Sequence, residues 1–243
     1  MKRILIINPN TTESVTEGVV DACRGAHPGV RWDGVTSRFG APYIADEIGY
    51  AVAAHAVLDA YGAFFDGHDA VLIACFGDPG LLALCELASV PVVGLAQASL
   101  SAAGQRGRFA VVTGGHTWGP MLTRFVRAHQ LDAPLVGIHT VDLTGAQIAA
   151  NPAAAIDDLA AAAQRGIDGG ADCILLGGAA LCGLTPTLQP RVGVPVLDNV
   201  LLAAQAVVDA ALSAAAPTAK PAWAVAQFLT PRASSTRDTG SAC

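Results

Sequence analysis

The chain has 243 residues, 52% of them hydrophobic and only 14% charged, which is enough to bury one large core or two smaller lobes. The formal net charge is −6, and the 14 Lys and Arg form no long basic run, which argues against nucleic acid or a membrane surface as partner. No apolar run reaches the ~18 residues that a helix needs to cross a bilayer. The six cysteines show no CxxC pair and no close Cys/His spacing, so we expect no metal site and no disulfide framework, but reduced thiols in the cytoplasm.

Short apolar segments alternate with segments of helical period from the N-terminus onward. Arg3–Asn8 is a predicted strand, and its apolar run is too short for a signal peptide. The helix that follows opens on a predicted capping-box pair, Ser14 and Glu17, and is closed by Pro28 and Gly29. Further along we predict a helix at Ala51–Phe65, a strand at Asp69–Phe76, a helix at Leu81–Ala88 and a strand at Val90–Leu95. This alternation predicts βαβ units and a mostly parallel sheet.

Three stretches of the first half recur in the second half, in the same order and at nearly one offset. The pairs are RILIINPNT (3–11) with RFAVVTGGHT (108–117), DAVLIACFGDPGL (69–81) with DCILLGGAALCGL (172–184), and SVPVVGLAQASL (89–100) with GVPVLDNVLLAA (193–204). We infer an internal duplication. The alternative is that unrelated βαβ units look alike because buried strands use few residue types. Both interpretations predict two similar lobes.

The predicted fold is therefore α/β, with two similar lobes that each contain a mostly parallel sheet flanked by helices, and an active site in the cleft between them. We assign residues 1–104 to an N-terminal lobe and residues 105–216 to a C-terminal lobe, joined near Ser101–Arg108. We expect residues 217–243 to form an extension that is partly disordered. The sequence leaves open whether a helix or strand near 205–229 packs back on the first lobe.

Cys75 stands at the end of a buried strand, where the apolar run AVLIACF stops at Gly77–Gly80. In parallel α/β sheets, ligands bind beyond the carboxyl ends of the strands. We expect a helix N-terminus directly after Cys75, which would lower the thiol pKa from about 8.5 and make it a usable base or nucleophile. The alternative role for a buried thiol is hydrophobic packing, which we assign to Cys23, Cys85 and Cys173.

Four motifs carry a resemblance to a known family: INPNTT at 7–12, CFGDPGL at 75–81, VVTGGHTWGPML at 111–122 and PVLDNV at 195–200. Together they resemble the hydantoin racemases, a branch of the aspartate/glutamate racemase superfamily that also contains arylmalonate decarboxylase and maleate isomerase. The resemblance covers roughly residues 1–212. It implies two lobes, a small-molecule substrate, no cofactor, and two cysteines on opposite faces of the substrate's α-carbon, one to remove the proton and one to return it. Cys75 matches the first cysteine.

The second cysteine of the family pattern is missing. The family motif is similar to LGCAGMAGL, whereas this chain reads LGGAALCGL at Leu176–Leu184, so Gly178 replaces the expected cysteine and Cys182 follows four residues later. Three interpretations stay open: Cys182 is the second catalytic thiol, Cys75 works alone on one face as in arylmalonate decarboxylase, or Cys75 is a covalent nucleophile as maleate isomerase suggests. Cys182 can equally be a packed helix residue.

Other residues at the same strand ends are candidate substrate contacts. An enolate intermediate needs preorganised N–H donors, which the turns after two strands supply. Asn8 and Asn10 can bind substrate carbonyls, or form a turn that caps the next helix. The predicted backbone donors and substrate contacts are Asn8, Asn10, Phe76, Gly77, Thr113, Gly114, Gly178 and Ala179.

We predict a cofactor-independent racemase or isomerase that moves a proton by thiol chemistry at an acidic carbon. The resemblance implies 5-substituted hydantoins or related amino-acid derivatives as substrates. The alternatives are a stereospecific single-cysteine decarboxylase, a maleate-type isomerase, and a small-molecule binding protein that has lost activity. The apolar composition is compatible with a homo-oligomer.

Overall fold

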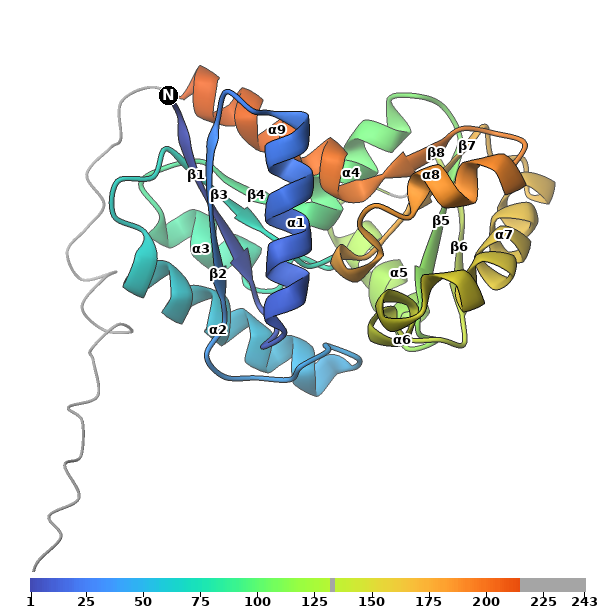
Figure 1. Ribbon diagram of the computed structural model, residues 1–243, viewed down its shortest axis with the longest axis horizontal. Helices are drawn as coiled ribbons and strands as arrows, with labels where there is room; N and C mark the ends of the chain where they lie inside the picture. The colour runs from blue at the N-terminus through green and yellow to red at the C-terminus, as the bar shows by residue number, and fades with distance from the viewer. Residues whose placement is uncertain (132–133, 215–243) are drawn as a thin grey trace, which may run out of the picture.

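The computed structural model describes residues 1–131 and 134–214, and it contains two four-stranded parallel sheets with helices packed against them (Figure 1). The first sheet has the order β2-β1-β3-β4, formed by Arg31–Thr36, Arg3–Asn8, Ala70–Ile73 and Val92–Gly94. The second has the order β6-β5-β7-β8, formed by Leu135–Val141, Phe109–Gly114, Cys173–Leu176 and Val196–Asp198. All neighbouring strands are parallel. The predicted α/β fold with two similar lobes is confirmed.

The internal repeat corresponds to this architecture strand by strand. The three repeated stretches contain β1 and β5, β3 and β7, and β4 and β8, and each pair has the same position in its sheet. The central strands are buried on both faces: Ile4 and Ile6 of β1 pack into one hydrophobic cluster, and Leu5 and Ile7 into another. Such strands are continuous apolar runs, which is why they were visible in the sequence.

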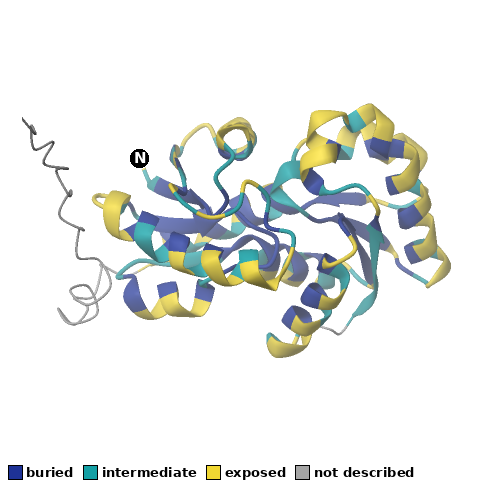
Figure 2. Cartoon of the chain, turned by 90° about the horizontal axis from the view of Figure 1, so that it is seen from below, coloured by how far each residue is buried: buried dark blue, intermediate teal, exposed yellow. Residues whose placement is uncertain are grey.

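The helices cover the sheets and hold the loops at the strand ends. In the first half they are α1 (Glu13–Ala26), α2 (Glu47–Phe64), α3 (Leu81–Leu87) and α4 (Leu95–Gly104). In the second half they are α5 (Trp118–Ala128), α6 (Gly145–Ala150), α7 (Pro152–Asp168), α8 (Thr185–Leu188) and α9 (Asn199–Ser213), with 3₁₀ turns η1 (Ala179–Leu181) and η2 (Gln189–Arg191). Figure 2 shows buried residues along the strands and on the helix faces that meet them. Within the described residues, no helix is long and apolar enough to cross a membrane.

Some predicted boundaries differ from the structure. The capping-box prediction is wrong, because α1 begins at Glu13 after Thr12 and makes no side-chain cap bond. Helix α2 begins earlier than expected, since the Asp46 carboxylate accepts from the Gly49 N–H at 2.7 Å and caps it. The edge strands β2 and β6 were not predicted; β2 mixes charged, small and apolar residues and is buried only at Trp32 and Val35.

Helix α9 returns the end of the described chain to the first sheet. Its buried residues Val200 and Ala203 share a hydrophobic cluster with Ile4 and Leu72 of that sheet. Figure 1 shows α9 beside α1 and β1, far from most of the second half. The predicted boundary at 104 and 105 falls between α4 and β5, and the predicted extension at 217–243 lies outside the described residues.

Candidate active site

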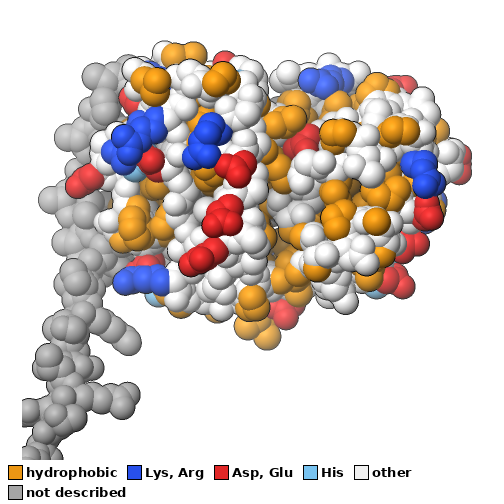
Figure 3. All heavy atoms as spheres, in the orientation of Figure 1, with side chains coloured by type: hydrophobic (Ala, Val, Ile, Leu, Met, Phe, Trp, Pro, Cys, Tyr) orange, Lys and Arg blue, Asp and Glu red, His pale blue; other side chains and the backbone are white. Residues whose placement is uncertain are grey.

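A cavity of about 240 Å³ lies where the carboxyl ends of the two sheets face each other. The first lobe contributes the β1–α1 loop, the start of α1, the β2–α2 loop and the residues after β3. The second lobe contributes the end of β5, α6 and η1. In the space-filling view of Figure 3, hydrophobic side chains gather along the groove between the lobes. The cavity is therefore at the position that open α/β sheets favour for ligands.

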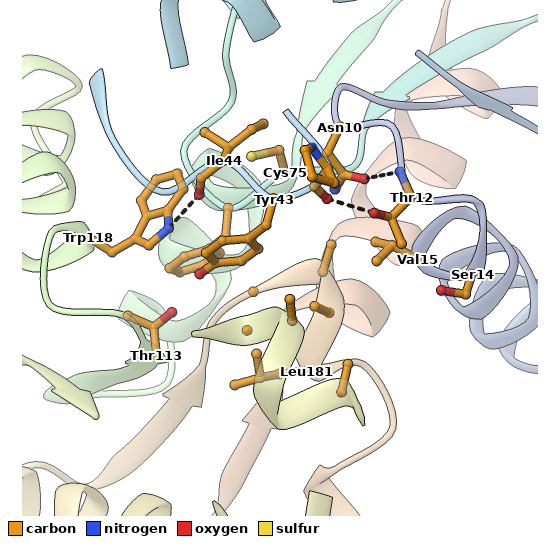
Figure 4. Close-up of a pocket in the computed structure, with 18 of the residues that line it drawn as sticks. Asn10, Thr12, Ser14, Val15, Tyr43, Ile44, Cys75, Thr113, Trp118 and Leu181 are labelled. Carbon is orange, nitrogen blue, oxygen red and sulfur yellow. Dashed lines mark hydrogen bonds between the residues drawn. The ribbon is translucent and has the colours of Figure 1, made fainter. Parts of the chain in front are cut away.

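Cys75 lines this cavity from the first lobe (Figure 4). It follows β3 by two residues and is 8% exposed. Its own carbonyl oxygen accepts the N–H groups of Gly77, at 2.9 Å, and Asp78, at 3.0 Å, which closes a tight turn. Helix α3 begins only at Leu81. The sulfur therefore reaches the cavity, but the expected helix N-terminus directly after Cys75 is absent.

Burial raises the pKa of the Cys75 thiol, and the nearby Asp78 carboxylate raises it further. The predicted lowering of this pKa is wrong. The physical reason is that the turn uses its N–H groups internally, so they cannot stabilise a thiolate, while the packed surroundings keep water away. At neutral pH, Cys75 is therefore a protonated thiol in the resting protein.

Asp78 fixes the turn that carries Cys75. Its carboxylate is buried and accepts from the backbone N–H groups of Ala96, at 2.8 Å, and Gln97, at 2.7 Å, in the first turn of α4. A Cβ on Gly94 would lie 2.2 Å from Oδ2 of Asp78, so only glycine fits there. Burial raises the pKa of Asp78 to about 7, although the N–H donors act in the opposite direction. Asp78 therefore has a structural role in this turn.

The predicted contacts in the first lobe divide into two groups. Asn10 and Phe76 line the cavity, whereas Asn8 and Gly77 do not. Asn8 is fully buried, and its amide nitrogen donates to Oδ1 of Asn10, at 3.0 Å, and to Oγ1 of Thr16, at 3.0 Å. Oδ1 of Asn10 also accepts from the Thr12 N–H at 2.8 Å, which leaves the Asn10 amide N–H₂ to donate to a ligand. Asn8 therefore orders the loop that presents Asn10.

The second lobe presents Thr113, Gly178 and Ala179 to the cavity, but not Gly114. A Cβ at Gly114 would lie 2.7 Å from the Leu143 carbonyl oxygen, so this glycine is required by close backbone packing. Gly178 has φ +128°, a conformation that other residues rarely adopt. The backbone at 178 is thus shaped for glycine.

Cys182 is not opposite Cys75. It lines a separate, neighbouring cavity of about 240 Å³, together with Gly18 and Leu184. Its sulfur donates to the carbonyl oxygen of Gly18 on α1, at 3.9 Å. Burial and the Asp198 carboxylate raise the pKa of Cys182 to about 12. The two thiols line different cavities, which argues against the interpretation that Cys182 is the second catalytic thiol.

The comparisons with known proteins agree with this architecture. The family model described as Asp/Glu/Hydantoin racemase matches residues 4–207. The chain belongs to this family. Hydantoin racemase of Pseudomonas sp. (strain NS671) is 31% identical over 203 residues, covering 82% of each chain, and hydantoin racemase of Paenarthrobacter aurescens is 32% identical over 203 residues, covering 82% of this chain and 86% of the relative. The crystal structure of allantoin racemase from Pseudomonas fluorescens superposes with a TM-score of 0.83 at 30% identity, covering 95% of this chain and 97% of that one.

The chain is thus an isomerase of the racemase type, as the four sequence motifs predicted. The cavity of this racemase is neutral: among the described residues that line it, none is Asp, Glu, Lys, Arg or His. Its walls are mainly apolar, with Val15, Ile44 and Leu181 joined by alanines of α6 and η1. A ligand held here meets hydrocarbon and a few uncharged polar groups.

Two aromatic residues of the site, Tyr43 and Trp118, were not among the predicted site residues. Tyr43 lies in the β2–α2 loop, and Trp118 begins α5. The Trp118 indole N–H donates to the carbonyl oxygen of Ile44 at 3.1 Å, and the Thr117 hydroxyl donates to that of Ala45. These bonds fasten a loop of the first lobe to a helix of the second. Trp118 stands in the motif VVTGGHTWGPML, whereas Tyr43 lies in a stretch for which the sequence predicted no element.

Proposed function

We propose that this racemase interconverts the enantiomers of 5-substituted hydantoins, and that the Cys75 sulfur moves the proton at ring carbon C5. The observation that carries the proposal is the position of Cys75, a thiol at a strand end in an uncharged cavity between two lobes. Two relatives at 31% and 32% identity bear the name hydantoin racemase, which supports a hydantoin as the substrate of this protein.

The chemistry needs a base at C5 and hydrogen-bond donors at the neighbouring carbonyl. The Cys75 thiol first loses its proton to water. The thiolate then takes the C5 proton, and the electron pair of the broken C–H bond moves into an enolate whose charge is on the C4 oxygen. Donors aimed at that oxygen stabilise the charge. The Asn10 amide N–H₂ and the Thr113 hydroxyl lie in the cavity wall and are suited to this role. Return of a proton to the opposite face completes racemisation.

The neutral cavity favours a hydantoin over a charged substrate. A carboxylate or a zwitterion without a charged partner loses hydration that an apolar wall does not replace, at a cost of several kcal/mol. The hydantoin ring is uncharged and carries its own acidifying carbonyl. The apolar wall favours an alkyl or aryl group on C5 over a polar ureido group such as that of allantoin.

One observation favours a second candidate, a one-face isomerase or decarboxylase. Position 178, where the family pattern has its second cysteine, is glycine, and Cys182 points elsewhere. A site with one proton-transfer group would deliver a proton from one side only. The absence of a cationic partner in the described cavity wall counts against the dianionic malonates that a decarboxylase would use.

Solvent deuterium exchange tests the proposal. The purified protein is incubated with L-5-benzylhydantoin in D₂O, and both C5 deuteration by NMR and optical rotation are followed. A racemase gives deuterated product of both hands, and Cys75→Ser stops the exchange, while Cys182→Ser serves as a matched thiol control. Label confined to the starting enantiomer would indicate one-face chemistry. No label with any hydantoin would remove the proposed function in favour of a binding protein.

A further inference from the structure

Racemisation through an enolate requires a second proton-transfer group facing Cys75 across the substrate. Gly178 has no side chain to supply it, and Cys182 is in the neighbouring cavity. Among the described residues that line the Cys75 cavity, the other side chain that titrates is Tyr43. The hydroxyls of Thr12, Ser14 and Thr113 do not ionise in the pH range of proteins.

Tyr43 belongs to the first lobe, but its hydroxyl contacts the second lobe. The phenol O–H donates to the carbonyl oxygen of Gly114, at the end of β5, at 3.4 Å. A Cβ on Gly115 would lie 3.5 Å from this hydroxyl, and a Cβ on Gly145 would lie 3.1 Å from the ring, so glycine backbone makes room for the tyrosine. In the view of Figure 4, the ring lies between Cys75 and Thr113.

The phenol and the thiol are close enough to influence each other. Burial raises the pKa of Tyr43, hydrogen bonds with the Gly145 backbone and the Trp118 side chain act in the opposite direction, and a charge on Cys75 adds to the rise. Both residues line the cavity: Cys75 follows β3 of the first lobe, whereas the Tyr43 hydroxyl contacts the end of β5 in the second lobe. A planar ring held between them would present opposite faces to the two groups.

We propose that Tyr43 is the second catalytic residue, and that its phenol delivers the proton to the face of C5 opposite Cys75. This step rests on the proposed function. The Tyr43 O–H bond breaks, a C5–H bond forms with the enolate electron pair, and tyrosinate and the Cys75 thiol remain. Proton exchange with water, or turnover of the other enantiomer in the reverse direction, restores thiolate and phenol. The raised phenol pKa suits a group that is a proton donor in its resting state.

The loop that carries Tyr43 is fixed independently of the phenol oxygen. Ile44 and Ala45 accept hydrogen bonds from Trp118 and Thr117 of the second lobe, and Glu47 pairs with Arg124. The Tyr43 hydroxyl donates to the Gly114 carbonyl oxygen at 3.4 Å and also interacts with the Gly145 backbone and the Trp118 side chain. The bonds that hold Ile44, Ala45 and Glu47 do not involve it. Tyr43→Phe therefore removes the proton donor and leaves the loop in place, which makes it a sharp test.

The test compares wild-type protein, Tyr43→Phe and Thr113→Val in the full chain, with each enantiomer of 5-benzylhydantoin in D₂O. We expect Tyr43→Phe to lose inversion by about 10²–10⁴-fold, the usual contribution of a general acid, and to retain C5 exchange without inversion in the enantiomer that Cys75 deprotonates. Thr113→Val should slow exchange and inversion together, because it removes a hydroxyl suited to the enolate oxygen. Thermal unfolding of each variant confirms that the fold is kept.

Two outcomes would overturn the role of Tyr43. One is inversion by Tyr43→Phe at the wild-type rate; the other is an equal loss of exchange and inversion in that variant, which would make Tyr43 a positioning residue. If wild-type protein exchanges no hydantoin, the proposed function fails together with this role. If the wild-type protein exchanges the C5 proton and Tyr43→Phe inverts the substrate at the wild-type rate, only the role of Tyr43 is overturned and the proposed function stands.

Discussion

The Cys182 sulfur lies 3.9 Å from the carbonyl oxygen of Gly18, so the thiol nearest to the family's second cysteine position bonds to α1 instead of facing Cys75. The contact joins the two lobes beside the active-site cavity. A wall formed by Ser14, Val15, Ala149, Ala179 and Ala180 belongs to both this cavity and the Cys75 cavity. Cys182 thus has a packing position next to the site but not in it.

Cys182→Ala should leave the racemisation rate within about twofold of wild type, because the thiol does not reach the substrate cavity. We expect a loss of stability of about 1 kcal/mol from the removed contacts. The measurements are initial rates of optical rotation and a urea unfolding curve. A tenfold or larger loss of rate at unchanged stability would return Cys182 to the mechanism.

Gly178→Ala should destabilise the protein by about 2–3 kcal/mol, since the backbone there has φ +128° and the new Cβ would lie 3.1 Å from Leu181. The control is Gly183→Ala, at φ +80°, where a new Cβ would have no other atom within 4 Å and we expect a smaller loss of about 1 kcal/mol. Chemical denaturation of the three proteins measures both values. Equal losses would show that the Leu181 contact adds nothing.

The value of kcat/KM should rise with pH from about 6 to about 9, because burial raises the pKa of the Cys75 thiol and only the thiolate removes a proton. The rate of alkylation of Cys75 by iodoacetamide should rise over the same range and fall when substrate is present. Peptide mass spectrometry identifies the alkylated residue. A rate that is flat across this pH range would mean that the thiol is already ionised in the resting enzyme.

The contribution of Asp78 to the free energy of unfolding should fall as pH rises from about 4 to about 7. Burial raises the pKa of Asp78 to about 7, so in this range its carboxyl holds more proton in the folded state than in the unfolded state. Its contribution to stability is complete only below the unfolded pKa of about 3.9 and is lost above about 7. Asp78→Asn should flatten this slope in urea unfolding measured at several pH values. Asp157→Asn, which removes an exposed carboxylate paired with Arg191, should keep it. An unchanged slope in Asp78→Asn would contradict the assignment.

Ala146→Leu should narrow the cavity from the α6 side and lower kcat/KM for 5-benzylhydantoin by about tenfold or more, with a smaller effect on 5-methylhydantoin. The control is Ala154→Leu on α7, which is exposed and outside the cavity lining. Steady-state kinetics with both substrates measures the ratio. A similar loss for both substrates would show that α6 does not contact the C5 group.

In each lobe a carboxylate connects the loop after one strand (β3 or β7) to the helix after the next strand (α4 or α9). The carboxylate belongs to the loop in the first lobe and to the start of the helix in the second. In the first lobe Asp78 of the loop accepts from the start of α4, and Gly94 leaves room for it. In the second lobe Asp198 caps its own helix and accepts from the Gly183 N–H at 3.3 Å. The sequence repeat aligns Gly94 with Asp198, so the first lobe has no carboxylate at this position. The repeat does not show that Asp78 binds the start of α4 instead, because Asp78 and its partner Gln97 are 19 residues apart in the chain.

The sequence alone determined the family, the two parallel sheets, the strand-end position of Cys75 and the glycine at 178. These features are encoded in short segments, since buried runs, turns and motifs each depend on neighbours within a few residues. Tertiary structure alone decided that Cys182 bonds to α1, that the Cys75 pKa rises, and that Tyr43 enters the cavity. The reason is that burial and side-chain partners arise between distant segments: the Tyr43 hydroxyl and the Gly114 carbonyl are 71 residues apart in the chain and 3.4 Å apart in the fold.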